Sequence, residues 1–166
     1  ALCTAITLPL LTTQVGAKET GNQSYNASLL SISMPSLTTQ ATENQRSNAV
    51  LPTISLPALT TQVSGNQRSN ALLTSISLPA LTAQVSGNQS YNAALTTFAA
   101  NALTSQIDSN QADNPLSTTI TTPALTSIGA GNYVGCTYGI MTINVDASLF
   151  GAADILLAQA GGATII

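Results

Sequence analysis

Apolar and polar residues recur together along most of this chain with a 22-residue period. Prolines mark the register, since Pro35, Pro57, Pro79 and Pro123 lie 22 or 44 residues apart, and Pro9 precedes the first of them by 26. A fixed period of this length is typical of solenoids, propellers and repeat arrays. The pattern therefore predicts a repetitive architecture with one structural unit per period.

Each unit contains two segments with the alternation of a β-strand. In "TSISL", residues 74–78, the serines face opposite to Ile76. In "LTTQV", residues 59–63, the same alternation puts Gln62 outside and Val63 inside. Helices are disfavoured because these segments are rich in Thr, Ser, Ile and Val, and nearly every unit has a proline. Each unit is thus predicted as a strand, a Gly-Asn turn, a second strand and a proline corner.

Repetition of this unit predicts an all-β fold, a β-solenoid of six coils over residues 8–142, in a single domain 1–166. Successive coils are expected to stack at ~4.8 Å. A four-residue surplus in "QVGAKETGNQ" predicts an exposed turn that holds Lys18 and Glu19. Columns of Leu and of Ile or Phe are expected to form the dry interior, together with a further column: Val15, Val63, Val85 and Ile107.

The two ends of the chain depart from the repeat. Residues 1–7 are expected to form a lead-in strand, and residues 143–166 a short helix followed by an apolar tail. Asp146 or Ser148 is the expected helix cap and Gly161 the terminator. The expected inner face of the helix comprises Leu149, Ala152, Ala153, Leu156 and Ala160. The tail either caps the last coil or, like the N-terminal "AITLPLL", pairs through "GATII" with a neighbouring molecule.

Amide residues repeat as faithfully as apolar ones. When coils stack in register, a column of carboxamides can pass hydrogen bonds along the stack, because each amide has a donor and an acceptor. Two columns are predicted to form such ladders: Gln14, Gln40, Gln62, Gln84 and Gln106, and Asn26, Asn48, Asn70, Asn92 and Asn114. Turn geometry, with a ladder as the alternative, is predicted for a third column, in which Asn usually follows Gly: Asn22, Asn44, Asn66, Asn88, Asn110 and Asn132.

Charge and candidate chemistry narrow the function classes. Charged residues make up 5% of the chain and its formal charge is -3, so neither nucleic acid nor anionic lipid is an expected partner. The chain has no run of 18 apolar residues, so no membrane span is predicted. The first residue is not Met, as expected of a processed or trimmed product.

Residues suited to catalysis or metal binding are few. The chain has no His, its one lysine lies in the expected turn insertion, and its carboxylates share no column. Asp108 and Asp113 loosely resemble a calcium loop but lack the Gly and Glu of an EF-hand. We expect no enzyme activity, no metal and no cofactor.

The two cysteines, Cys3 and Cys136, are expected at opposite ends of the stack. Five steps between coils separate them by roughly 24 Å, whereas a disulfide joins Cα atoms up to about 7 Å apart. A bond within one molecule would need a terminus that runs back along the solenoid. A bond between molecules would need head-to-tail stacking, and free thiols are the third interpretation.

The unit resembles the curlin repeat of bacterial extracellular amyloid fibres. The resemblance lies in the unit length and in the order Gln62, Gly65, Asn66 or Asn70, and Ala71. It implies strand-turn-strand coils, polar ladders and a secreted protein. Such a protein would polymerise with itself into an extracellular fibre or matrix.

An ordered solid such as ice is the alternative partner. Small hydroxyls that face outward would stack into flat rows, similar to the ice-binding faces of solenoid antifreeze proteins. A solvated strand face without such a function explains the same residues. The rows are Thr12, Thr38, Thr60, Thr82, Thr104 and Thr126, and Ser31, Ser33, Thr53, Ser55, Ser75, Ser77, Thr119 and Thr121.

Overall fold

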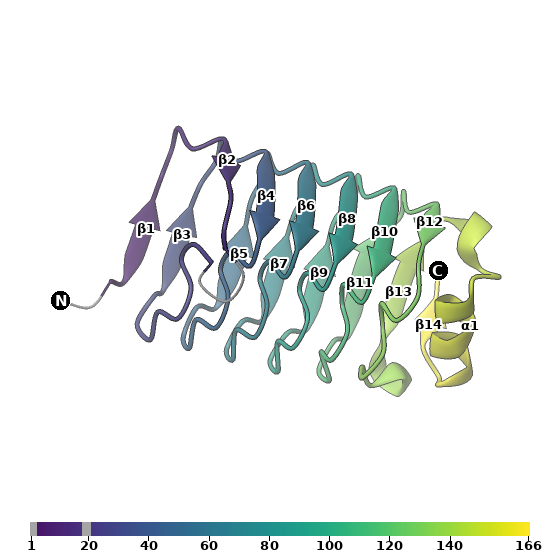
Figure 1. The fold of residues 1–166 in the computed structure, drawn as a ribbon. Coiled ribbons are helices and arrows are strands. Elements are labelled where there is room, and N and C mark those ends of the chain that lie inside the picture. The colour runs from purple at the N-terminus through teal and green to yellow at the C-terminus, as the bar shows by residue number, and fades with distance from the viewer. Residues whose placement is uncertain (1–2, 18–20) are drawn as a thin grey trace.

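The computed structural model describes residues 3–17 and 21–166 and shows a parallel β-solenoid of about seven turns (Figure 1). The all-β class, the spacing of about 22 residues and the single short C-terminal helix are as predicted. The predicted turn positions of Lys18 and Glu19 lie outside the described residues.

Two six-stranded parallel sheets run along the solenoid, each receiving one strand from most coils. The first, which we call the Gln sheet, comprises β2 (Thr13–Gln14), β4 (Thr39–Thr42), β6 (Thr61–Ser64), β8 (Ala83–Ser86), β10 (Ser105–Asp108) and β12 (Ser127–Ile128). The second, the Ile sheet, comprises β5 (Thr53–Ser55), β7 (Ser75–Ser77), β9 (Thr97–Ala99), β11 (Thr119–Thr122), β13 (Thr142–Val145) and β14 (Thr164–Ile165). At the N-terminal end, β1 (Ala5–Thr7) pairs with β3 (Ser31–Ser33).

Strands of successive coils pair in a register that equals the period of the sequence. Gln62 pairs with Gln84, and Ile76 pairs with Phe98, in each case one full period further along the chain. Equal positions of the repeat therefore lie above one another, which is the condition for ladders.

Pro52 separates β5, the edge strand of the Ile sheet, from β3 of the preceding coil. At the same place in neighbouring coils, the backbone N–H of Leu30 donates to Thr4 O at 2.8 Å and that of Thr74 donates to Pro52 O at 2.9 Å. Proline has no N–H, so Pro52 cannot donate to the preceding coil. The coils still stack there, but β3 and β5 belong to different hydrogen-bonded sheets.

The strand alternation shifts at the corner before the Gln sheet. The backbone N–H groups of both Thr60 and Thr61 donate to Thr38 O, at 2.9 and 3.2 Å, so the chain bends between them. As a result Gln62 points inward and is fully buried, while Val63 is 38% exposed. The predictions that Gln62 faces outward and that the Val column lines the interior are therefore wrong. The other members of that column are exposed as well: Val15, Val85 and Ile107.

The interior has a dry half and an amide half. The dry half is built from stacked apolar columns, and each fully buried Leu, Ile or Phe contributes about 1.5 to 3 kcal/mol relative to exposure. Typical columns are Leu51, Leu73 and Leu95; Ile54, Ile76, Phe98, Ile120 and Ile143; and Leu37, Leu59, Leu81, Leu103 and Leu125. The amide half lies beside the turns and is described below.

The C-terminal segment closes one end of the solenoid with η1 (Tyr138–Ile140), η2 (Ala147–Leu149) and α1 (Ala153–Ala160) (Figure 1). Gly161 ends α1 as predicted. Neither Asp146 nor Ser148 caps α1, whose N-cap is Ala152. Asp146 caps η2, where its side chain accepts from the backbone N–H of Ser148 before the helix begins. The buried face of α1 carries Ile155 and Ala158. Ala153, Leu156 and Ala160, predicted on that face, are exposed.

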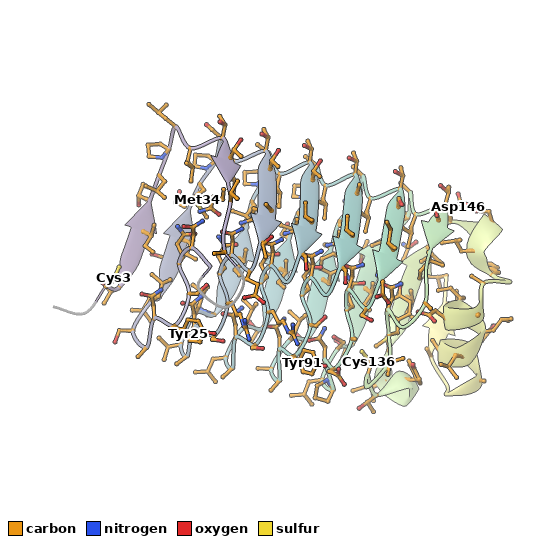
Figure 2. All side chains as sticks on the ribbon, viewed as in Figure 1. Cys3, Tyr25, Met34, Tyr91, Cys136 and Asp146 are labelled. Atoms are coloured by element: carbon orange, nitrogen blue, oxygen red, sulfur yellow. The ribbon has the colours of Figure 1, made fainter. Side chains whose placement is uncertain are left out.

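The strand after α1 stays within the molecule. Thr164 and Ile165 of β14 pair in parallel with Thr142 and Ile143 of β13, so "GATII" extends the Ile sheet of its own chain. Cys3 and Cys136 are both free thiols, and Figure 2 places them at opposite ends of the solenoid. They form no disulfide with each other, because the described residues at neither end run back along the stack.

Candidate functional site

The turns between the two sheets have an alternating backbone. In one coil Gly65, Gln67 and Ser69 have φ angles of 65°, 52° and 58°, in the left-handed region. Asn66 lies between two of them and is not left-handed itself, so the backbone tolerance of Asn does not explain its column. Asn66 and Gln67 are consecutive and both fully buried. The alternating turn thus delivers two amide side chains per coil to the interior.

A second Gln column, which we call the turn Gln column, interlocks with the predicted one on the strands. Gln62 Nε2 donates to Gln40 Oε1 of the preceding coil at 3.0 Å, and Gln67 Nε2 donates to the same oxygen at 2.6 Å. Gln67 Nε2 also reaches Gln45 Oε1 at 2.8 Å. This column was not predicted, although its signal, "NQ" recurring at the period of the repeat, is present in the sequence. Its members are Gln23, Gln45, Gln67, Gln89 and Gln111.

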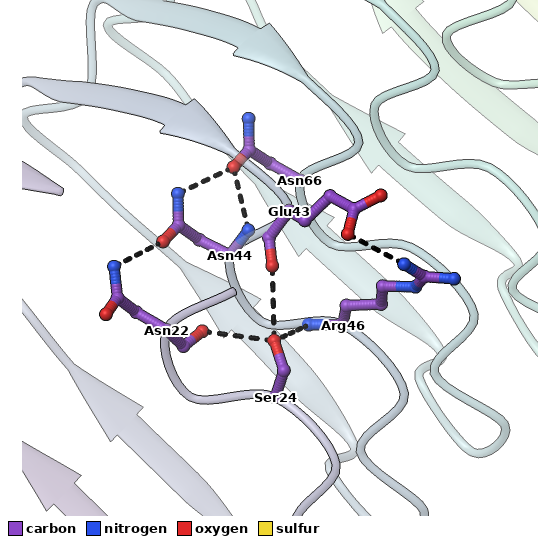
Figure 3. Close-up of polar contacts among 6 residues, drawn as sticks. All are labelled: Asn22, Ser24, Glu43, Asn44, Arg46 and Asn66. Carbon is purple, nitrogen blue, oxygen red and sulfur yellow. Dashed lines mark hydrogen bonds and ion pairs between the residues drawn. The ribbon is translucent and has the colours of Figure 1, made fainter. Parts of the chain in front are cut away.

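The column from Asn22 to Asn132 lies in the turns and forms a continuous ladder. Asn22 Nδ2 donates to Asn44 Oδ1 at 3.0 Å, and Asn44 Nδ2 donates to Asn66 Oδ1 at 2.9 Å (Figure 3). The oxygen of Asn66 also accepts the backbone N–H of Asn44 at 3.1 Å. These bonds point toward the C-terminal end, opposite to those of the Gln columns.

The column from Asn26 to Asn114 joins backbone to side chain. The backbone N–H of Asn70 donates to Asn92 Oδ1 at 2.9 Å, and Asn70 Nδ2 donates to the backbone carbonyl of Gln45 at 2.8 Å. A direct amide-to-amide bond occurs between Asn26 and Asn48, at 3.2 Å. This column therefore gives partners to buried backbone groups of the turns, such as the Gln45 carbonyl and the Asn70 N–H, which would otherwise be unpaired.

These networks specify the register of the coils. A hydrogen bond contributes roughly 0.5 to 1.5 kcal/mol net, whereas a buried polar group left unpaired costs about 1 to 3 kcal/mol. Inner carboxamides of the Gln columns and of the Asn22–Asn132 ladder bond to the coils on both sides, as Gln62 and Asn44 do. A slip of one residue would therefore break several bonds at every rung. The arrangement serves as a rigid scaffold, and its two ends decide what it can join.

The Gln columns stop at the C-terminal end. Gln106 is in register with Ile128, which has no amide, and Tyr133 occupies the next place of the turn Gln column. Gln106 Oε1 and the Tyr133 hydroxyl are buried and, within the described residues, have no hydrogen-bond partner. Burial raises the pKa of Tyr133 well above its ordinary value, and the negative charge of Asp154 adds to this.

The Asn ladder ends on the helix that caps the solenoid. Asp154 follows Asn132 by one full period, the same spacing as in the ladder. Its carboxylate accepts the backbone N–H groups of Asn132 at 2.6 Å and Gly131 at 3.2 Å. An ionised carboxylate only accepts hydrogen bonds, so no donor is passed to a further coil.

At the N-terminal end no described strand or helix covers the first coil. A hollow of about 360 Å³ lies there and is bordered by Leu11, Gln14, Asn22 and Gln23, the first members of their columns. Neither β1 nor β2 pairs with a strand on its outer side in the described part of the chain. Leu10, beside the hollow on the first corner, is 87% exposed. We call this surface the open N-terminal coil.

The predicted hydroxyl rows lie on the outside, exposed or half-buried. The corner row runs from Thr12 to Thr126, and the other row runs from Ser31 on β3 to Thr121 on the Ile sheet. In the corner row each hydroxyl from Thr38 onward donates to the same residue of the preceding coil, as Thr82 Oγ1 does to Thr60 O at 3.0 Å. This bond holds the side chains from Thr38 to Thr126 in one orientation.

Other chemistry is sparse. Among the described residues, no cluster of three or more His, Cys, Asp or Glu side chains is placed to hold a metal ion, and no helix is both long and apolar enough to cross a bilayer. Arg46 Nη1 forms an ion pair with Glu43 Oε2 at 2.7 Å beside the Asn ladder (Figure 3). Burial raises the pKa of Cys136 to about 11.

Known proteins offer no family for this chain. No family model, curated sequence or solved structure matches it significantly. Its β-solenoid fold and its buried Gln and Asn ladders are therefore established by its own geometry, and the curlin-like repeat remains a resemblance.

Proposed function

We propose that this chain is a secreted structural protein that assembles with copies of itself, through the open N-terminal coil, into an extracellular fibre or matrix. The observation that carries the proposal is the hollow of about 360 Å³ at an end where β1 and β2 have no strand partner on their outer side within the described residues. Such an edge is a template for another chain. Covering Leu10 and Val15, which are 87% and 71% exposed, adds apolar burial.

The two ends of the solenoid differ, and this difference sets the order of the assembly steps. The C-terminal end is covered by α1 and β14, so open N-terminal coils pair first. A fibre grows when an incoming coil displaces the cap. The capped state then keeps the protein soluble until assembly begins, and no enzymatic role is part of the proposal.

Size-exclusion chromatography with light scattering and negative-stain electron microscopy test this. The wild type is expected to form dimers that convert to filaments with rising concentration. Leu10→Lys, at the open N-terminal coil, should stay monomeric because the charge would be buried on assembly. Leu156→Lys, on the exposed side of α1, is the matched control and should assemble. A wild type that stays monomeric at high concentration contradicts the proposal.

Binding to an ordered solid such as ice is the second candidate. The observation that favours it is the corner row of six threonines, each from Thr38 onward oriented by the same hydroxyl bond. Thermal hysteresis of the wild type, lost in the double variant Thr60→Lys, Thr82→Lys, would support it. The absence of hysteresis at millimolar protein would end it.

A further inference from the structure

A groove of about 330 Å³ runs along the turn side of the solenoid, at the end away from the open N-terminal coil. Its polar side chains include Arg68, Tyr91, Ser109 and Asp113. We call it the turn groove. The groove spans several coils, which are stacked at ~4.8 Å steps. Arg68 and Asp113 are two coils apart and therefore line opposite ends of the groove.

Arg68 has no carboxylate partner among the described residues. Arg46, one period earlier, is neutralised by Glu43 at 2.7 Å, and Gly65 takes the place of Glu43 beside Arg68. In the described parts of the chain, Arg68 forms no ion pair, and its Nε is buried without an acceptor. Its guanidinium lies 4.6 Å from the centre of the Tyr91 ring, which orients it along the groove.

Small residues create the space. Ser90 and Ala112 follow Arg68 in its column, and Gly87 and Gly131 stand in the column of Glu43. All four line the turn groove. The groove therefore occurs where Ser90 and Ala112 follow the arginines of their column and where Gly87 and Gly131 have no side chain. The ladders beneath it hold its floor rigid.

The side chains of the groove have complementary chemistry. The Asp113 carboxylate has no hydrogen-bond donor among the described residues and accepts up to four bonds. The Tyr91 ring is half exposed and offers an apolar face beside polar groups. The positive charge of Arg68 is balanced by the negative charge of Asp113, so the groove has no net charge. This favours a neutral ligand rich in hydroxyls over an ion.

We infer that the turn groove binds a saccharide unit. Asp113 accepts hydrogen bonds from neighbouring sugar hydroxyls, Arg68 donates to a hydroxyl or ring oxygen, and Tyr91 packs against a C–H face of the ring. The site lies on the side of the solenoid and not at its N-terminal end. Saccharide binding therefore does not depend on the proposed self-assembly.

NMR titration tests the inference on the full chain carrying Leu10→Lys, which is expected to be monomeric. The probes are the methyl glycosides of glucose, galactose, mannose, N-acetylglucosamine and glucuronic acid. At least one is expected to shift the backbone amides of Gly87, Ser109 and Gly131, with those of Glu43 and Asn44 unchanged. If none of the five shifts the groove amides, or if the shifts occur elsewhere, the inference is wrong.

Variants separate recognition from folding. Arg68→Gln and Asp113→Asn should each weaken binding about tenfold, the loss of one charge-assisted bond. Asn suits the left-handed backbone of residue 113, so the fold should survive. Arg46→Gln, in the same column but outside the groove, is the control and should bind within twofold of wild type. Equal affinities of all three variants and wild type would overturn the assignment.

Discussion

The carboxylate of Asp154 accepts the backbone N–H of Asn132 at 2.6 Å, in the way that the amide oxygen of Asn132 accepts the backbone N–H of Asn110 at 3.0 Å. Each acceptor lies one full period after its donor. The capping helix thus docks through the same column that stacks the coils. Because a carboxylate has no N–H, the stack ends where Asp154 replaces Asn.

Asp154→Ala should loosen this cap. Two backbone N–H groups lose a charged acceptor, so the free energy of unfolding should fall by roughly 1 to 2 kcal/mol. Hydrogen exchange at Gly131 and Asn132 should accelerate, and filaments should appear sooner in electron micrographs. Asp146→Ala, which affects only the exposed cap of η2, is the control. Unchanged exchange at Asn132 would contradict the capping role.

Gln62→Leu should be strongly destabilising although the residue stays buried and similar in size. Leu cannot accept from Gln84 Nε2 or donate to Gln40 Oε1, so at least two buried polar atoms each lose a hydrogen bond. We expect a loss of about 3 kcal/mol in urea unfolding. Val63→Ala, one residue later and on the outer side, should change stability by about 0.5 kcal/mol or less. Similar effects of the two substitutions would refute the inward position of Gln62.

The two cysteines should differ in reactivity. Cys3 is exposed, whereas burial raises the pKa of Cys136 to about 11, so its thiolate is rare at neutral pH. A colorimetric disulfide reagent at pH 7.5 should label one thiol quickly and the other only on unfolding. Cys3→Ser should abolish the fast phase and Cys136→Ser should keep it. Two fast phases in the wild type would show that Cys136 is accessible.

Stability should fall at alkaline pH. The folded pKa of Cys136, about 11, lies above the ordinary thiol value of 9.0, so between these values the unfolded chain ionises while the folded chain keeps its proton. The unfolded state then binds fewer protons, and the free energy of unfolding decreases as pH rises above about 9. Tyr133 acts in the same direction. Urea unfolding from pH 8 to 11 should show this decline, less steeply in Cys136→Ser; an equal slope would exclude the thiol as a cause.

Sequence periodicity predicted much of the fold and part of the candidate site. Strand alternation located the strands that carry Ile76 and Gln62 and indicated stacked amide columns. It failed at Thr60 and Thr61, because two consecutive N–H groups share one acceptor there and a bend of this kind leaves no mark in a polar-apolar pattern. Strand alternation does not indicate the ladder role of Gln67, although its period is present in the sequence, or of Asp154, which continues the Asn column by spacing alone.

By itself the sequence determined that coils of one fixed length stack with equal residues above one another, because a strict period permits only one register that pairs every amide. Only the tertiary structure decided which side of each strand faces inward, how the Asn columns divide their bonds, and that one end is capped while the other is open. Those features depend on where the chain bends and on which groups from distant coils meet. Neither is encoded in the spacing of residues along a single coil.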